Sequence, residues 1–237
     1  MKEVKGKINS FYSTGAVDGP GVRFIVFMQG CPLRCVYCHN PETWNLEGDE
    51  YTVDEVLEKV LRYKSYFKEK GGITVSGGEP LLQSQFVTEL FRRCKIEKIN
   101  TVLDTSGGTG SLENISELLE VTDLVLLDVK FTTEEEYYKY TKGSLKHTLE
   151  FLDYCNKLKV PVWIRQVIVN SINDTKEKVL ELKEIIEKYN NIEKIELLPF
   201  KKFCIDKYVR LGIDFPLTDI EETSNKVIEE LSYIING

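Results

Sequence analysis

The feature that most constrains the fold of this chain is a repeated alternation of short apolar runs with longer amphipathic segments. Six runs rich in Val, Ile and Leu are each followed by a helical pattern, and they cover residues 22–29, 72–76, 100–104, 123–129, 160–169 and 194–198. Their hydrophobicity is more continuous than alternating, which is typical of strands covered on both faces. The sequence therefore predicts an α/β fold with a parallel sheet and right-handed crossovers.

The amphipathic segments predict helices between these strands. Thr52 and Glu55 have the spacing of a capping box, and an apolar stripe follows them as far as Phe67. Similar helical patterns cover residues 83–94, 112–120, 145–158, 175–189 and 219–235. A complete eight-unit barrel takes about 250 residues. Six units therefore predict either an incomplete barrel or an open doubly wound sheet, and the pattern alone does not choose between them.

The composition is that of an ordinary globular protein. The 237 residues are 42% hydrophobic and 29% charged, and no linker rich in Pro, Gly or Ser divides them, which predicts one large domain over residues 1–237. The net charge of −7 gives no reason to bind nucleic acid or an anionic membrane. Because the N-terminus lacks the apolar core of a signal peptide and no run approaches a spanning helix, we expect a soluble, cytoplasmic protein.

Three of the six cysteines lie close together, in a loop that leaves the first predicted strand. Cys31, Cys35 and Cys38 have the spacing C-x3-C-x2-C. The other three, Cys94, Cys155 and Cys204, stand alone in the sequence, and isolated cysteines are usually small buried residues. In a reducing compartment such a group indicates a metal site. Three thiolates can hold three corners of a cubic iron–sulfur cluster, whereas a structural zinc site needs four closed ligands. One iron would then lack a protein ligand, which is typical of a catalytic metal.

Unusual residues also follow the other predicted strands. They are Gly77-Gly78-Glu79-Pro80, Asp104-Thr105, Asp128 with Lys130, and Pro199-Phe200. Polar groups that gather at the carboxyl ends of parallel strands form the active sites of both barrels and open sheets. We therefore expect the chemistry at this edge of the sheet.

With the cysteine loop and the Gly77-Gly78-Glu79-Pro80 strand end, the chain resembles the radical S-adenosylmethionine superfamily, and within it the activating enzymes of glycyl radical enzymes. The segments that carry the narrower resemblance are Asp18-Gly19-Pro20-Gly21-Val22-Arg23, Tyr37-Cys38-His39-Asn40-Pro41, Asp104-Thr105-Ser106-Gly107, Asp128-Val129-Lys130 and Val162-Trp163-Ile164-Arg165. The resemblance implies a partial (β/α)6 barrel, a [4Fe-4S] cluster and S-adenosylmethionine. No cysteine lies between Cys38 and Gly77, so a ferredoxin-like insert is absent there, which favours the pyruvate formate-lyase type or another insert-free activase.

The resemblance also implies roles for individual residues. Cys31, Cys35 and Cys38 hold the cluster, and Asp18 and Arg165 lie toward the substrate. The residues implied to contact the cofactor are Tyr37, Cys38, His39, Gly77, Gly78, Glu79, Asp104, Asp128, Val129 and Lys130, with a monovalent cation beside Asp104 as an open alternative. Most have a simpler interpretation as turn, cap or solvated strand-end residues. Where the family usually has a His after Leu-Pro and an aromatic residue, this chain has Lys201.

The activity implied is the reductive cleavage of S-adenosylmethionine, followed by removal of a hydrogen atom from a backbone glycine of pyruvate formate-lyase. Flavodoxin or ferredoxin is the implied reductant, and a monomer is expected. Three alternatives remain open at this point: an activase of another glycyl radical enzyme, a radical enzyme with a small-molecule substrate such as a deazapurine synthase, and an iron–sulfur protein without turnover.

Overall fold

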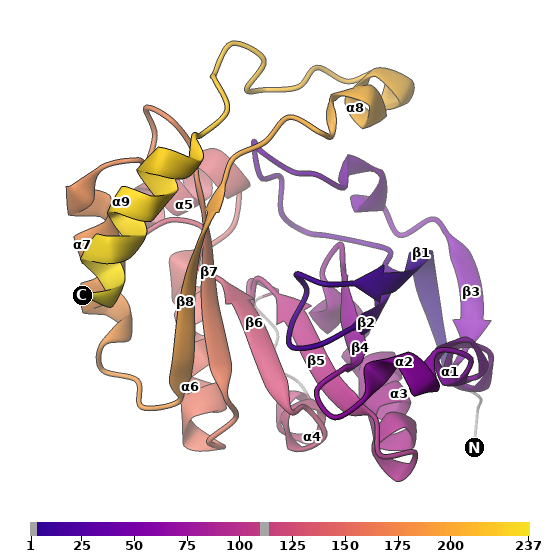
Figure 1. Ribbon diagram of the computed structural model, residues 1–237. Helices are drawn as coiled ribbons and strands as arrows, with labels where there is room; N and C mark the ends of the chain where they lie inside the picture. Colours follow the sequence, from indigo (N-terminus) through magenta and orange to yellow (C-terminus); the bar gives the residue numbers. More distant parts are fainter. Residues whose placement is uncertain (1–3, 110–113) are drawn as a thin grey trace.

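The computed structural model describes residues 4–109 and 114–237, and its centre is one eight-stranded sheet (Figure 1). The strands are β1 (Lys5–Gly15), β2 (Arg23–Met28), β3 (Asp49–Thr52), β4 (Gly72–Gly77), β5 (Asn100–Thr105), β6 (Leu124–Asp128), β7 (Val162–Ile168) and β8 (Ile192–Pro199). The helices are η1 (Pro41–Thr43), α1 (Val53–Leu61), α2 (Lys64–Phe67), η2 (Pro80–Gln83), α3 (Ser84–Ile96), α4 (Ile115–Glu120), α5 (Glu134–Thr141), α6 (Leu145–Lys157), α7 (Lys176–Ile186), α8 (Ile205–Leu211) and α9 (Asn225–Asn236).

The strand order distinguishes between the two architectures that the sequence left open. The sheet runs β3-β1-β2-β4-β5-β6-β7-β8, and β2 and β4 through β8 are parallel neighbours in chain order. A doubly wound sheet reverses its strand order at a switch point, whereas a barrel adds each strand beside the previous one. The sheet ends at β3 and β8 without closing, so the predicted partial barrel is confirmed, and the six predicted strands are its six parallel strands.

Among the described residues, the strands β1 and β3, the α-helices α5 and α8 and the short 3₁₀ helices η1 and η2 are not predicted from the sequence. β1 and β3 extend the sheet in antiparallel fashion beyond β2, with Tyr12 opposite Ile25 and Gly6 opposite Tyr51. The polar, lysine-containing sequence of β1 gives no strand pattern, because β1 and β3 form the antiparallel end of the sheet and bury few side chains. The helices α5 and α8 are also missing from the prediction, since both are short and each is interrupted by charged residues.

Several predicted helix boundaries need correction. The stripe from residue 53 to 67 is two helices, because a turn in which the Tyr63 N–H bonds to the Val60 carbonyl separates α1 from α2. The capping box of Thr52 and Glu55 is present. The last helix begins at Asn225, after Ser224 caps it, and not at residue 219. Residues 112 and 113 of the predicted 112–120 helix lie outside the described residues.

The two faces of the sheet differ in character because successive strand residues point to opposite sides. On the outer face Val75, Leu103, Leu127 and Ile164 are fully buried and pack in the main core under the helices. The inner face carries a small apolar cluster of Val102, Leu124 and Leu126, packed with Trp163. Further along the same inner face the side chains become polar, and these are Ser76, Asp104, Asp128 and Arg165. The barrel interior therefore holds a small apolar cluster and becomes polar at the carboxyl ends of its strands.

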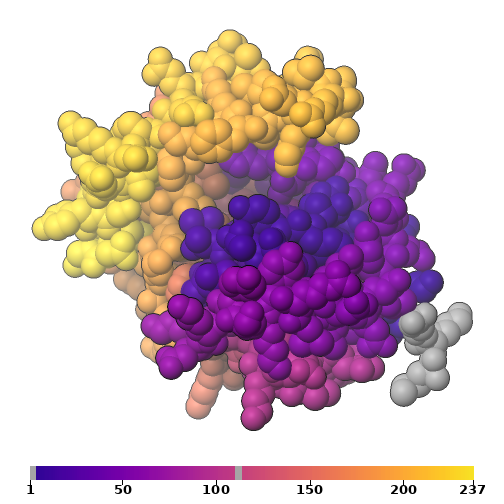
Figure 2. All heavy atoms as spheres, turned by 45° about the vertical axis from the view of Figure 1, so that its right-hand side comes forward, coloured from indigo at the N-terminus to yellow at the C-terminus, as the bar shows by residue number. Residues whose placement is uncertain are grey.

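The segment from residue 200 to 224, which includes α8, lies across the carboxyl edge and reaches the N-terminal third of the chain (Figures 1 and 2). Lys207 Nζ lies 2.6 Å from Glu42 Oε1, and the Tyr208 hydroxyl donates to the carbonyl of Cys38 at 3.2 Å. The segment thus joins the open end of the barrel, after β8, to the loop after β2. No helix among the residues described is long and apolar enough to span a membrane.

Candidate active site

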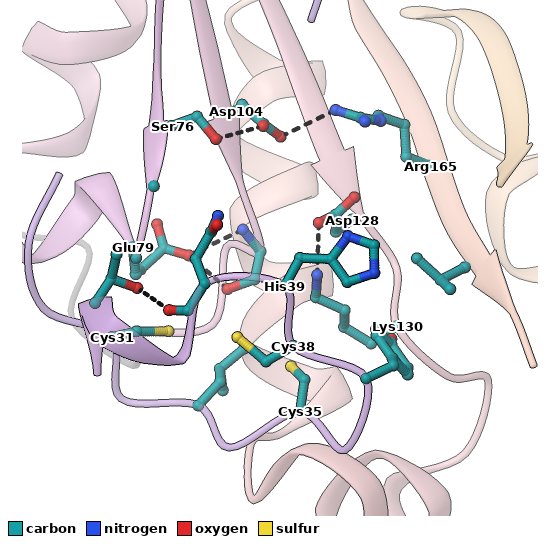
Figure 3. Close-up of a pocket in the computed structure, with 18 of the residues that line it drawn as sticks. Cys31, Cys35, Cys38, His39, Ser76, Glu79, Asp104, Asp128, Lys130 and Arg165 are labelled. Carbon is teal, nitrogen blue, oxygen red and sulfur yellow. Dashed lines mark hydrogen bonds and ion pairs between the residues drawn. The ribbon is translucent and has the colours of Figure 1, made fainter. Parts of the chain in front are cut away.

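A cavity of about 340 Å³ lies at the carboxyl ends of the parallel strands (Figure 3). The predicted site residues that line it are Asp18, Cys31, Cys35, Tyr37, Cys38, His39, Gly77, Gly78, Glu79, Asp104, Asp128, Lys130 and Arg165. The structure does not bring the side chain of Val129 to this cavity. It points to the opposite face and is fully buried in the main core, while its N–H bonds to the Arg165 carbonyl at 3.0 Å.

The cysteine loop is fixed by main-chain hydrogen bonds to two other parts of the chain. The Gly30 N–H bonds to Thr43 in η1, and the Arg34 N–H bonds to the Thr141 carbonyl at the end of α5 at 2.7 Å. Within the loop the Cys38 N–H bonds to the Cys35 carbonyl at 3.0 Å. These contacts place three free thiols on the cavity side of one loop, as Figure 3 shows.

The three thiols fit an iron–sulfur cluster better than a single ion. Burial raises the pKa of Cys31 and of Cys35 to about 12, and repulsion from neighbouring thiolates acts in the same direction. Bound metal cations would supply the missing compensation and displace the protons. In the described parts of the chain no three His, Cys, Asp or Glu side chains converge on one point as ligands of a single ion would. A cubic cluster binds each cysteine through a different iron, which suits separated sulfurs on one loop.

The glycine pair after β4 lies directly against the start of the cysteine loop. The Gly78 N–H bonds to the Met28 carbonyl at 2.9 Å, and the Glu79 N–H bonds to the Gly30 carbonyl at 2.7 Å. A Cβ on Gly77 would lie 2.2 Å from the Met28 nitrogen, and Gly77 has a φ of +117°. Both glycines are therefore required by the close approach of two backbones, whatever else they contact.

Glu79 is a buried clamp between the ends of β4 and β5. One carboxylate oxygen accepts hydrogen bonds from the Thr105 hydroxyl and from the Leu81 N–H, and the other accepts from the Ser106 N–H and hydroxyl. The side chain is 1% exposed. Its oxygens are thus already engaged within the protein, and what the strand end offers a ligand is mainly the backbone of the glycine pair.

The polar part of the barrel interior is a network of alternating charges. Asp104 accepts a hydrogen bond from the Ser76 hydroxyl at 2.6 Å and lies 3.4 Å from the Arg165 guanidinium, while Asp128 lies 2.5 Å from Lys130 Nζ. Burial raises the pKa of Asp104 to about 6, although Arg165 opposes this. Burial alone would lower the pKa of Lys130, but the adjacent Asp128 carboxylate helps hold it well above its ordinary value.

The Asp18 turn enters the barrel beside this network and is held there by a buried arginine. The Arg23 side chain is fully buried, and it donates to the Thr74 hydroxyl, to the Asn100 side chain and to the Ile73 carbonyl. The Thr74 hydroxyl in turn donates to the Asp18 carbonyl at 2.7 Å. Burial raises the pKa of Asp18, and the charges of Arg165 and Arg23 act against that rise.

At the rim of the cavity His39 and Lys201 meet through an unpredicted contact. His39 Nε2 lies 2.8 Å from the main-chain carbonyl of Lys201, and the His39 ring lies beside Phe203. The Lys201 ammonium group points to Glu222 Oε2 at 3.3 Å and to the Thr223 carbonyl at 3.4 Å. Lys201 lines the cavity, but its ammonium group binds Glu222 and Thr223, which are not among the cavity-lining residues.

Some cavity residues had no role in the sequence interpretation. Ser76, Thr105 and Ser106 all line the cavity and bind the carboxylates described above. A signal was available for Ser76, because it lies two residues after Thr74 on the inner face of a predicted strand. Thr105 and Ser106 lie within a segment that carried the resemblance, but their partner Glu79 is too distant in sequence for a local pattern to reveal.

Comparison with known proteins agrees with this geometry. Residues 25–186 match the family model of the radical SAM superfamily. The chain is 47% identical over 221 residues to the pyruvate formate-lyase-activating enzyme of Clostridium pasteurianum, covering 92% of each chain. It is 42% identical to the corresponding enzyme of Staphylococcus epidermidis, covering 98% of this chain and 96% of that one.

The chain belongs to the radical SAM superfamily, and within it to the pyruvate formate-lyase-activating enzymes. Solved structures of radical SAM proteins share its fold. A domain of a pyruvate formate-lyase-activating enzyme from Bacteroides vulgatus aligns with a TM-score of 0.58 at 21% identity, over 70% of this chain and 93% of that chain. SuiB of Streptococcus suis bound to S-adenosylmethionine aligns with a TM-score of 0.62 at 16% identity, over 87% of this chain and 44% of that chain.

Proposed function

We propose that this radical SAM enzyme installs the glycyl radical of pyruvate formate-lyase, using a [4Fe-4S] cluster and S-adenosylmethionine. The observation that carries the proposal is one cavity in which three free cysteines face a polar network from four neighbouring strands. When bound and reduced, the cluster supplies one electron that cleaves S-adenosylmethionine to methionine and a 5′-deoxyadenosyl radical, which takes a hydrogen atom from a substrate glycine. The chain binds, orients and shields the reactants.

Named residues divide this work. Cys31, Cys35 and Cys38 would hold the cluster, and the open backbone of the glycine pair at 77 and 78 suits the amino group of S-adenosylmethionine. Lys130 offers a cation for a carboxylate, and the Asp128 carboxylate can accept hydrogen bonds from ribose hydroxyls. Asp104 is buried with a partly compensated charge, which suits a cationic ligand, including a monovalent cation.

The protein substrate would enter beside the Asp18 turn. Asp18 and Arg165 lie on the same side of the cavity, and each influences the charge of the other. A carboxylate and a guanidinium at one mouth can bind the N–H and carbonyl groups of an extended peptide. We therefore assign these two residues to the backbone of the glycine loop of the substrate.

We further propose that the reductant is an acidic one-electron carrier, a flavodoxin or a ferredoxin. Arg34, Lys139 and Lys142, here called the basic rim, are exposed beside the cysteine loop, because α5 is hydrogen-bonded to that loop. Each lies over an aromatic ring, and within the residues described none has a carboxylate partner. On a chain of net charge −7 this rim favours an acidic partner beside the cysteine loop. We place this chemistry in the cytoplasm and in a single-domain monomer.

The test is the formation of a glycyl radical. Reconstituted protein is incubated anaerobically with reductant, S-adenosylmethionine and pyruvate formate-lyase, and the lyase is examined by electron paramagnetic resonance. We expect a glycyl radical and 5′-deoxyadenosine with the wild-type chain and neither with Cys35→Ser, while Cys94→Ser and Cys155→Ser retain both. Deoxyadenosine without a glycyl radical would indicate a different substrate, and full activity of Cys35→Ser would refute the cluster assignment.

A further inference from the structure

Trp44 is a rigidly held side chain next to the cysteine loop. It follows η1, and its carbonyl accepts a hydrogen bond from the Cys31 N–H at 3.4 Å. The Arg34 guanidinium lies 5.0 Å from the centre of the indole ring, and the Tyr208 ring meets the indole edge-on at 6.0 Å. The Tyr208 hydroxyl also donates to the Cys38 carbonyl at 3.2 Å, so one tyrosine contacts both Trp44 and the third cysteine.

The indole N–H of Trp44 lacks an adequate acceptor. Nε1 is buried and forms no hydrogen bond of normal geometry with any acceptor that the structure describes. A buried N–H left in this state is destabilising. Its partner is the sulfur of Cys38, which the Asn40 N–H and the Trp44 indole N–H approach as the two donors.

A metal-bound thiolate would satisfy this donor where a thiol does not. A neutral thiol sulfur is a weak acceptor, whereas hydrogen bonds to charged acceptors are shorter and roughly twice as strong. Arg34 over the ring face makes the indole N–H a better donor, since a cation there withdraws electron density. The Trp44 indole N–H is therefore better matched to the metal-bound thiolate than to the free thiol.

We propose that Trp44 is a positioning residue that donates an N–H···S hydrogen bond to Cys38 of the bound cluster and raises the reduction potential of that cluster. The proposal rests on the proposed function, because it assumes that Cys38 is a cluster ligand. Hydrogen bonds to the sulfurs are among the factors that set cluster potentials. Since the reduced cluster carries one more negative charge, a donor to its sulfur stabilises the reduced form more.

The test compares reduction potentials in the absence of substrate and S-adenosylmethionine. Wild type and Trp44→Phe are reconstituted to equal iron content and titrated with electron paramagnetic resonance as the readout. At the wild-type midpoint we expect the ratio of reduced to oxidised cluster to fall about three- to tenfold in Trp44→Phe, tenfold being 59 mV for one electron. Trp163→Phe, in the small apolar cluster inside the barrel, should leave the midpoint unchanged. An unchanged midpoint in Trp44→Phe overturns the proposal.

A second measurement does not depend on Trp44→Phe loading correctly. Trp44 and Trp163 are the two tryptophans of the chain, so Trp163→Phe labelled with indole nitrogen-15 carries the label at Trp44 alone. Pulsed electron–nuclear double resonance on the reduced cluster should then detect a coupled nitrogen-15 nucleus, and its absence refutes the hydrogen bond. Both measurements omit pyruvate formate-lyase. A loaded chain that shows the coupling but forms no glycyl radical would refute the proposed function and leave this inference intact.

Discussion

Asp104 is a carboxyl group whose pKa is raised by its burial in the barrel interior. The folded pKa is about 6, whereas an aspartate in the unfolded chain has a pKa of about 3.9. Between these pH values the folded protein binds more protons than the unfolded chain, so this group makes the free energy of unfolding fall as pH rises through that window. Asp104→Asn removes the charge and with it this contribution.

We therefore expect the free energy of unfolding of Asp104→Asn, measured relative to wild type, to be about 1–3 kcal/mol more favourable to the variant at pH 7 than at pH 4. Urea unfolding of both proteins at the two pH values measures the difference. Asp206→Asn changes an exposed carboxylate on α8 and provides the control. Equal stability differences at pH 4 and pH 7 would show that Asp104 is not perturbed in this way.

Lys201 occupies the position where the family usually has histidine, and we expect it to contribute little. Its ammonium group is directed to Glu222 and Thr223, and the carbonyl that contacts His39 belongs to the main chain. Lys201→Ala keeps that carbonyl, so S-adenosylmethionine binding should weaken about tenfold at most. Calorimetric titration of reconstituted protein, with Lys202→Ala as the control, tests this. A loss of about a hundredfold would mean that the lysine contacts the cofactor directly.

Asp18 allows cofactor chemistry to be separated from substrate binding. Its carbonyl accepts the hydrogen bond that fixes the turn, while the residue also lines the cavity in which we place the substrate. Asp18→Ala should therefore lower glycyl radical yield about tenfold or more, the value of one charge-assisted hydrogen bond. Background cleavage of S-adenosylmethionine, measured as 5′-deoxyadenosine without lyase, should change little. If both yields fall together, Asp18 serves the cofactor site or the fold.

The sequence predicts most residues of the site because polar residues at strand ends share one side of the sheet. Asp104, Asp128 and Arg165 obey this alternation and meet in the cavity. Val129 follows Asp128 directly, so the same alternation turns its side chain to the opposite face. The hydrogen bonds of Glu79 and the orientation of the Trp44 indole depend on partners far apart in sequence, so no local pattern could show them.

At the scale of the elements, the junction between β4 and β5 depends on Glu79. Glu79→Gln replaces one acceptor oxygen by an N–H₂ group, which would face the donors of Thr105 and Leu81 or of Ser106. We expect a loss of about 2–4 kcal/mol in the free energy of unfolding. Glu97→Gln breaks a surface ion pair with Lys64 and should cost less than about 1 kcal/mol. Urea unfolding compares the two variants, and equal costs would contradict the clamp.

The elements that sequence analysis recovered are those whose burial gives them a strong pattern. The six parallel strands lie between helices and the barrel interior, so their apolar runs are continuous. β1 and β3 lie at the rim, where one face is exposed and alternation with polar residues obscures the strand. The choice between barrel and doubly wound sheet depends on strand order, which is a property of long-range pairing and leaves no local trace.

At the scale of the whole molecule, the cysteine loop contacts both the segment from 200 to 224 and the basic rim. Lys207 and Tyr208 fasten that segment to the cysteine loop. The basic rim of Arg34, Lys139 and Lys142 lies beside the same loop, next to α5. The proposed substrate entry beside Asp18 lies toward Arg165, which is at the opposite end of the cavity from the cysteines (Figure 3). The proposed electron carrier and substrate would therefore use different parts of the surface and need not compete.

The basic rim makes the reductant assignment testable. Lys139→Glu combined with Lys142→Glu reverses two charges without altering the cysteine loop, so electron delivery from reduced flavodoxin should slow about tenfold or more at low salt. Reduction by dithionite, a small molecule, should be nearly unchanged, and the wild-type rate with flavodoxin should fall as ionic strength rises. Lys176→Glu with Lys226→Glu makes the same charge change on α7 and α9, outside the basic rim. Stopped-flow absorbance of the cluster measures each rate, and equal slowing by the two double variants would place the docking surface elsewhere.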